Sequence, residues 1–221
     1  MKNLTIKFSA FFLFAFLFFM SCSTPEAEQK ALENTALEEA SPKETSSENE
    51  ASRGVAITYK VKQYIFQRPV AAFGSGHVGV GYEVRTYSNG VQSNIKYYFG
   101  AVENGQGSPR VPAGGNNGGW WQSASTGAAM FSVMKNSYGY KNVKFRIAYS
   151  NLSDTRRNNA LNRISKFPSR GYLLATNNCM NACWDVLSEL ATPNVAWVEN
   201  NILPNAWYNM TTNGWSSSRA L

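Results

Sequence analysis

The chain has 221 residues, and its 21 basic side chains outnumber its 14 acidic ones to give a net charge of +7. It contains one histidine and three cysteines. Only two of these cysteines, Cys179 and Cys183, lie beyond Cys22 near the N-terminus, and with one histidine they supply too few ligands for a typical four-ligand zinc site, so we expect neither a metal nor another cofactor. The length suits one folded domain with a single core.

The N-terminus has the features of an export signal. Two lysines precede or flank an apolar run of about 13 residues from Phe8 to Met20, which is too short to span a bilayer. The segment Phe19-Met20-Ser21-Cys22 resembles the cleavage box of bacterial lipoproteins, which implies that residues 1–22 are a signal peptide and that Cys22 carries lipid. We therefore expect an exported protein that this lipid anchors to a membrane, at the periplasmic face or the cell surface. The alternative is an ordinary secretory signal with a nearby cysteine.

Residues 23–53 are predicted to form a disordered acidic tether ahead of a folded domain at 54–221. The tether holds eight of the 14 acidic residues and no aromatic residue, so it cannot bury enough apolar surface to fold alone. From Arg53 onward, 17 basic side chains face six acidic ones, a net charge of about +11. Such a domain attracts polyanions of the cell envelope, while export argues against a nucleic acid as its partner.

A helix is predicted to begin at Cys179. Asn177 and Asn178 precede it, and either can cap the free N–H groups of a helix start. In the first turn the helix dipole favours negative charge, so the Cys179 thiol is biased toward the thiolate, the form that attacks a carbonyl carbon. The following positions carry an apolar stripe at helical spacing, namely Cys179, Ala182, Cys183, Val186, Leu187 and Leu190.

Cys179 and Cys183 are the two cysteines of the predicted domain. In an oxidising compartment, two such cysteines commonly form a disulfide. Positions four apart within one helix make a strained pair, however, so we expect free thiols. The disulfide remains the alternative.

The dipeptide Asn89-Gly90 lies between two alternating runs and predicts a two-residue β-hairpin turn. With these two residues as the turn, apolar side chains oppose one another on one face, and Glu83 opposes Lys96 on the other. Because a slip of one residue would destroy this pattern, we predict this register. The apolar pairs are Val78 with Ala101, Val80 with Phe99, Tyr82 with Tyr97, and Val84 with Ile95.

The single histidine, His77, lies at the start of the first hairpin strand, on a face that it shares with Gly79 and Gly81. Missing side chains leave a shallow patch there, on which the cysteine helix could dock with its N-terminus beside His77. Asn104 is diagonal to His77 in this register, and one bulge would substitute Glu103. Either residue would orient the imidazole, as the third member of a catalytic triad does. The alternative is two surface polar residues at a strand end.

Residues 105–119 contain six glycines and two prolines and are predicted to form a long irregular loop. Trp120 and Trp121 follow directly. These tryptophans could stack on sugar rings or shield a substrate, or they could anchor the core, which is the commoner role of tryptophan.

Two further strands are predicted at 56–67 and 143–149, because apolar and polar residues alternate there. Between the second strand and the cysteine helix, Ser153 or Asp154 caps a helix that Pro168 ends.

Thr192-Pro193 is predicted to end the cysteine helix. The tail that follows alternates aromatic residues with Asn and Pro, and we expect it to wrap around the core. Its aromatic residues are Trp197, Trp207, Tyr208 and Trp215.

The order of these motifs resembles a known group of enzymes. A Gly-His-Val-Gly-Val strand entry at 76–80, a second strand ending in Tyr97-Tyr98-Phe99-Gly100, and Asn177-Asn178-Cys179 at a helix start are similar to the permuted branch of the NlpC-type, papain-like cysteine hydrolases. Lecithin retinol acyltransferase belongs to this broad group. In its permuted branch the histidine strand precedes the cysteine helix, as it does here.

The resemblance implies an α+β fold with a circularly permuted papain-like core, in which the cysteine helix packs on an antiparallel sheet. It also implies Cys179 as nucleophile, His77 as base, and a polar residue at the end of the second hairpin strand that orients the histidine. We assign the last role to Asn104. Our candidate substrate-binding residues are Tyr98, Trp120, Trp121 and Asn178.

We therefore expect an exported, lipid-anchored thiol hydrolase or transferase that cleaves an amide or ester bond by a Cys-His mechanism. Backbone N–H groups of Cys179 and its neighbours would stabilise the oxyanion. The substrate would be a cell-envelope polymer, such as cell-wall peptide, or an acyl lipid. The first alternative is a non-catalytic lipoprotein that holds glycan or anionic polymer through its Trp-rich loop and positive charge. The second is that His77 and Cys179 are both ordinary core residues.

Overall fold

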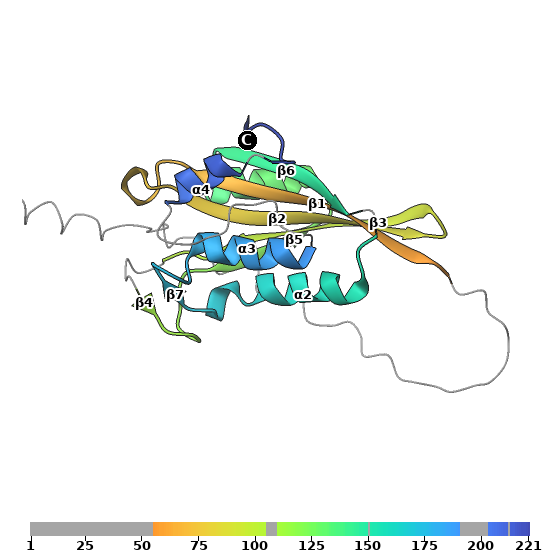
Figure 1. Cartoon of the computed structure of the whole chain (residues 1–221), viewed down its shortest axis with the longest axis horizontal. Coiled ribbons are helices and arrows are strands. Elements are labelled where there is room, and N and C mark those ends of the chain that lie inside the picture. Colours follow the sequence, from red (N-terminus) through yellow and green to blue (C-terminus); the bar gives the residue numbers. More distant parts are fainter. Residues whose placement is uncertain (1–54, 105–109, 150, 191–202, 212) are drawn as a thin grey trace, which may run out of the picture.

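The computed structural model describes residues 55–104, 110–149, 151–190, 203–211 and 213–221 (Figure 1). The predicted signal peptide, Cys22 and the acidic tether lie outside the described residues, as do Thr192-Pro193 and Trp197. Within the described ranges, no helix has both the length and the apolar character needed to cross a bilayer.

Six antiparallel strands form the main sheet, in the order β5-β3-β2-β1-β6-β8. The strands predicted at 56–67 and 143–149 are confirmed by β1 and β6. The bounds are β1 Ile57–Arg68, β2 His77–Ser88, β3 Val91–Ala101, β5 Trp120–Ala124, β6 Asn142–Tyr149 and β8 Arg219–Ala220. A separate two-stranded ladder pairs β4 (Arg110–Val111) with β7 (Tyr172–Leu173).

Four α-helices accompany the sheet in the described part of the chain: α1 Gly127–Ser132, α2 Asp154–Ser165, α3 Cys179–Leu190 and α4 Pro204–Met210. A π-helical turn at Val133–Ser137 continues α1, and short 3-10 turns lie at Ala72–Gly74 and Phe167–Ser169. The molecule therefore has the expected α+β class, with the cysteine helix packed on an antiparallel sheet.

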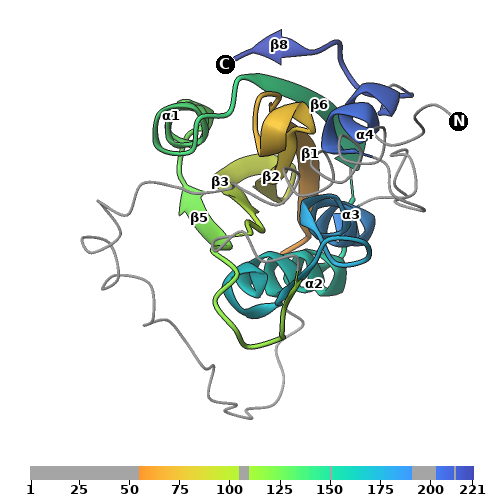
Figure 2. The ribbon, with the colours of Figure 1, turned by 90° about the vertical axis from the view of Figure 1, so that its left-hand side faces the viewer.

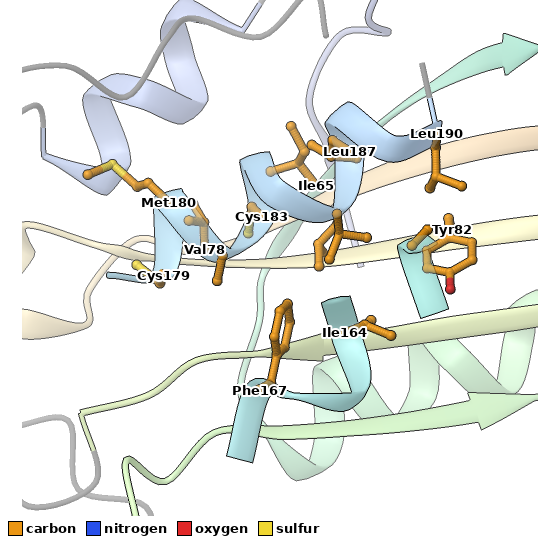
Figure 3. Packing of buried hydrophobic residues seen from close by; sticks show 14 of the residues in the cluster. Ile65, Val78, Tyr82, Ile164, Phe167, Cys179, Met180, Cys183, Leu187 and Leu190 are labelled. Carbon is orange, nitrogen blue, oxygen red and sulfur yellow. The ribbon is translucent and has the colours of Figure 1, made fainter. Parts of the chain in front are cut away.

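The sheet is covered on both faces. The α3-side core joins Ile65, Val78 and Val80 of the sheet to apolar side chains of α2 and α3. Figure 2 shows these two helices beside the sheet, and Figure 3 shows Ile65 and Val78 near Ile164 of α2 and Leu187 of α3. The α1-side core lies on the other face, where Phe66 and Phe99 pack on Met130 of α1 and residues of the following π-helical turn. Alternate residues of the central strands thus enter different cores, so both faces of these strands are buried.

The hairpin register differs from the prediction away from its turn. Ser88 opposes Val91, as expected for an Asn89-Gly90 turn, but the register shifts between Thr86 and Tyr87, and beyond that point every pair moves by one residue. The extra residue on β3 is Ser93, whose hydroxyl donates to the Thr86 carbonyl at 3.3 Å. This is a β-bulge. The observed pairs are Val80 with Gly100, Tyr82 with Tyr98, Glu83 with Tyr97, and Val84 with Lys96.

The predicted cap of α2 is confirmed at Ser153, whose hydroxyl accepts from the Arg156 N–H. The tail was predicted to wrap around the core. Trp207, Tyr208 and Trp215 are buried as expected, and the first two belong to α4. Pro204 occupies the start of that helix, where its missing N–H costs nothing.

Candidate functional site

Asn178 caps α3 and fixes where Cys179 lies. Its Oδ1 accepts the N–H of Met180 at 2.9 Å and that of Asn181 at 3.3 Å, while Asn181 Oδ1 accepts the N–H of Asn178 at 3.2 Å. This reciprocal arrangement is a capping box, and it makes Cys179 the first residue of the helix. The Asn178 amide also donates to the Leu174 carbonyl at 2.8 Å, so its polar atoms hold the helix start instead of facing a substrate.

The two cysteines of α3 are free thiols in similar burial but different surroundings. Figure 3 shows both on the helix beside the strand that carries Val78. Cys183 is 1% exposed within the α3-side core, and burial raises the pKa of its thiol well above the ordinary value. Cys179 is 3% exposed at the helix start and lies close enough to His77 for its charge to raise the pKa of the imidazole.

His77 occupies the first position of β2 and is 4% exposed. Its Nε2 lies 3.1 Å from Glu103 Oε1, an ion-pair contact. Burial acts to lower the pKa of His77, but the charges of Glu103 and Cys179 outweigh burial and hold that pKa well above its ordinary value. The imidazole is therefore the group that links the buried carboxylate to the sulfur at the helix start.

Glu103, and not the predicted Asn104, is the partner of His77. Continuing the observed hairpin register past Ala101 brings Glu103 opposite His77, which is the substitution that a single bulge produces. The carboxylate is 2% exposed. Burial acts to raise its pKa, yet the charges of His77 and Arg68 lower it to about 2.

Arg68 holds the second oxygen of this carboxylate. Its Nη2 lies 3.0 Å from Glu103 Oε2, and its Nη1 donates to the Tyr138 carbonyl at 3.1 Å. Arg68 ends β1 directly opposite His77 in the β1–β2 ladder. The start of β2 therefore supplies the imidazole of His77, and the adjacent end of β1 supplies Arg68, the cation that holds Glu103 in place.

The glycine face of β2 is not the docking surface of the cysteine helix, contrary to the prediction. A Cβ at Gly79 would lie 2.9 Å from Tyr140 Oη, and one at Gly81 would lie 3.0 Å from the Phe66 ring. The α1-side core fills this face, whereas α3 lies across the side chains of Val78 and Val80. Removing side chains on one face creates room there, but the apolar stripe of α3 gains more by covering aliphatic side chains on the other.

The aromatic residues predicted to bind substrate make mainly core contacts. Trp120 is buried in the α1-side core and stacks on Tyr138, with ring centroids 3.5 Å apart. Trp121 is partly buried against the α3-side core. Tyr98 stacks on Tyr82, with ring centroids 5.2 Å apart, and lines a groove of about 170 Å³ with Val84, Thr86, Asn94, Lys96 and Arg157.

No family model, curated protein sequence or solved structure matches the chain. Its chemistry is therefore inferred from its own residues. In the part of the chain that the structure describes, no group of three or more His, Cys, Asp and Glu side chains could hold a metal ion.

Proposed function

We propose that this chain is an exported, lipid-anchored thiol hydrolase or transferase that cleaves an amide or ester bond, with Cys179 as nucleophile, His77 as acid and base, and Glu103 as the residue that orients the histidine. One observation carries the proposal: the single imidazole of the chain is buried between a carboxylate and a sulfur at a helix start. A nucleophile, a base beside it and a third group that orients the base are the recurring parts of such sites.

In the proposed reaction, the Cys179 sulfur bonds to the carbonyl carbon and its proton is held by His77. His77 then gives the proton to the departing amine or alcohol, and the acyl group stays on the sulfur. Water or a second acceptor attacks this thioester, again losing its proton to His77, and the Cys179–acyl bond breaks. Glu103 stabilises the imidazolium throughout, since Arg68 keeps the carboxylate charged and fixed.

The start of α3 also offers a donor for the oxyanion. Asn178 occupies the N–H groups of Met180 and Asn181, so the N–H of Cys179 is the helix-start donor that this cap does not use. In papain-like and related sites a donor at this position stabilises the negative oxygen of the tetrahedral intermediate. We assign this role to the Cys179 N–H.

The arrangement of elements supports a permuted papain-like core. The histidine strand precedes the cysteine helix in the chain, that helix packs on the antiparallel sheet, and the third group comes from the end of the next strand. The excess of basic residues from Arg53 onward favours anionic material of the cell envelope. We propose cell-wall peptide or an acyl lipid as substrate.

The first test compares thiol alkylation in a Cys183→Ala chain with and without His77→Ala. Iodoacetamide labelling at neutral pH, followed at Cys179 by mass spectrometry, should slow by at least about tenfold when the imidazole is removed. Cys179→Ala is the matched control, because the remaining buried Cys183 should label far more slowly. Equal Cys179 rates with and without His77 would remove the basis for catalysis.

The second test identifies the bond. The full chain, Cys179→Ser and Cys183→Ala are incubated with cell-wall peptide fragments and with acyl lipids, and the products are identified by mass. We expect cleavage by the unmodified chain and by Cys183→Ala, and none by Cys179→Ser. If envelope glycan binds while no variant cleaves either substrate, the chain is the non-catalytic envelope-binding lipoprotein instead.

A further inference from the structure

The turn between β1 and β2 connects two residues of the proposed site. It begins after Arg68, which holds Glu103, and it ends at His77. Three of its residues have positive φ, with values of +48° at Ala72, +88° at Gly74 and +85° at Gly76. A non-glycine residue with positive φ is uncommon and costs free energy, so the conformation of this turn depends on outside support.

Asn205, in the first turn of α4, supplies that support. Its Nδ2 donates to the carbonyls of Pro69 at 2.9 Å and Gly74 at 2.8 Å, and its backbone N–H donates to the Ser75 carbonyl at 3.1 Å. Its Oδ1 accepts from Gln67 Nε2 at 2.8 Å. One side chain therefore bonds to the strand end before the turn, to the beginning of the turn, and to its end.

The turn is shaped around this side chain. A Cβ at Gly76 would lie 2.0 Å from Asn205 Oδ1, closer than two such atoms can approach. Glycine at position 76 thus satisfies two requirements at once, a positive φ and room for the asparagine. Because His77 is the next residue, a shift of Asn205 has to move the backbone that carries the imidazole.

The helix that carries Asn205 is itself firmly placed. Trp207 is fully buried and Tyr208 nearly so. At the other end of α4, the buried Lys144 Nζ donates to the carbonyls of Tyr208 at 2.8 Å and Thr211 at 2.9 Å. This second attachment lies away from the turn, so the two ends of α4 can be perturbed separately.

We infer that Asn205 is a positioning residue, which sets the place of the His77 imidazole between Glu103 and Cys179 by fixing the turn from Pro69 to Gly76. The inference rests on the proposed function. Asn205 touches neither reacting group and acts through the backbone of Ser75 and Gly76. A displacement of about 1 Å in a catalytic group is enough to cost a large factor in rate.

The test uses the fact that His77 is the single histidine of the chain. In a chain purified without a histidine tag, the imidazole C–H resonances in a proton NMR titration report this residue alone. Asn205→Ala and the equally sized Asn205→Asp, which replaces two donors by acceptors, should both move the measured pKa of His77 from its raised value toward the ordinary one. Both should also slow Cys179 alkylation roughly tenfold.

Lys144→Met is the matched control, because it weakens the other attachment of α4 and leaves the turn contacts in place. It should lower the midpoint of thermal unfolding, as Asn205→Ala does, without changing the His77 titration or the alkylation rate. Equal effects from Lys144→Met and Asn205→Ala would overturn the inference, as would wild-type behaviour in Asn205→Asp. A Cys179 rate that does not depend on His77 would instead overturn the proposed function on which the inference rests.

Discussion

Two buried carboxylates on the hairpin differ in what they hold. Glu103, just after β3, is 2% exposed, and Glu83, in the middle of β2, is 3% exposed. Each pairs with an arginine, Arg68 in the first case and Arg85 in the second. The second partner of Glu103 is His77, whereas that of Glu83 is the Tyr64 hydroxyl, at 3.0 Å.

The two clusters differ in whether the group beside the carboxylate can give up or take a proton near neutral pH. Burial, and then the neighbouring Glu83, raise the pKa of Tyr64 further above its ordinary value of 10.0, so this phenol keeps its proton near neutral pH. The pKa of His77 is raised above its ordinary value by the charges of Glu103 and Cys179, so the imidazole can carry a proton beside the sulfur. A buried carboxylate with an arginine is therefore common to both clusters, and only the imidazole and the sulfur distinguish the candidate site.

The largest expected effect separates Glu103→Gln from Glu83→Gln. Glutamine keeps the size of the side chain but loses the charge that stabilises the imidazolium, so Cys179 alkylation and any turnover should fall by about 100-fold in Glu103→Gln. In Glu83→Gln they should stay within about twofold, because this carboxylate contacts Tyr64 and Arg85 instead. Equal losses would mean that both clusters only hold the sheet together.

The next largest expected effect is the pH dependence of the unfolding free energy that the Glu103–His77 pair provides. The folded-state pKa of Glu103 is about 2, below its ordinary 4.5, so its contribution to stability is present above 4.5 and is lost as the pH falls toward 2. His77 has a raised pKa, so its contribution is full below 6.5 and is lost as the pH rises through the folded-state value. The cost of Glu103→Gln in urea denaturation should therefore be largest between pH 4.5 and 6.5, up to about 3 kcal/mol.

The Glu83 cluster provides the contrast in the same experiment. Since Tyr64 does not titrate near neutral pH, the cost of Glu83→Gln should be equal at about pH 6 and about pH 9. Over the same interval the cost of Glu103→Gln should fall. A flat profile for Glu103→Gln would contradict the paired, charged state of His77.

The smallest expected effect compares the two tyrosines next to these clusters. Tyr64→Phe removes the hydroxyl that Glu83 accepts, which should cost about 1 kcal/mol of unfolding free energy. The ring centroid of Tyr140 lies 6.0 Å from that of His77. The Tyr140 hydroxyl nevertheless has no hydrogen-bond partner among the described residues. Tyr140→Phe should therefore change stability by less than about 0.5 kcal/mol, as measured by urea denaturation.

In the hairpin, the local sequence predicted the turn but not the pairing register of the two strands. The Asn89-Gly90 turn was predictable, because its backbone needs positive φ at both positions and both show it, at +49° and +81°. The register beyond Thr86 was not. A shift of one residue turns the other set of β3 side chains toward each face, and both sets contain apolar residues, because Tyr97 and Phe99 belong to the α1-side core while Tyr98 packs against the α3-side core.

The candidate site was predictable to the same extent. Cys179 at a helix start and His77 at a strand start both follow from local patterns of capping and alternation, and the structure brings them together. Asn104 was assigned in place of Glu103 because one bulge decides which of two neighbouring residues faces His77. Asn178 was assigned to substrate, although its position before a helix also predicted the cap that it forms.

What this sequence determined by itself is local: the turn, the helix that begins at Cys179, the strand that begins at His77, and their order along the chain. Those features depend on backbone preferences, capping and periodicity within a few residues. Only the tertiary structure decided that α3 covers Val78 and not Gly79, that Glu103 meets His77, and that Asn205 of α4 supports the turn before it. These choices depend on packing on both faces of the sheet and on contacts between distant segments, for which a one-dimensional pattern offers nearly equal alternatives.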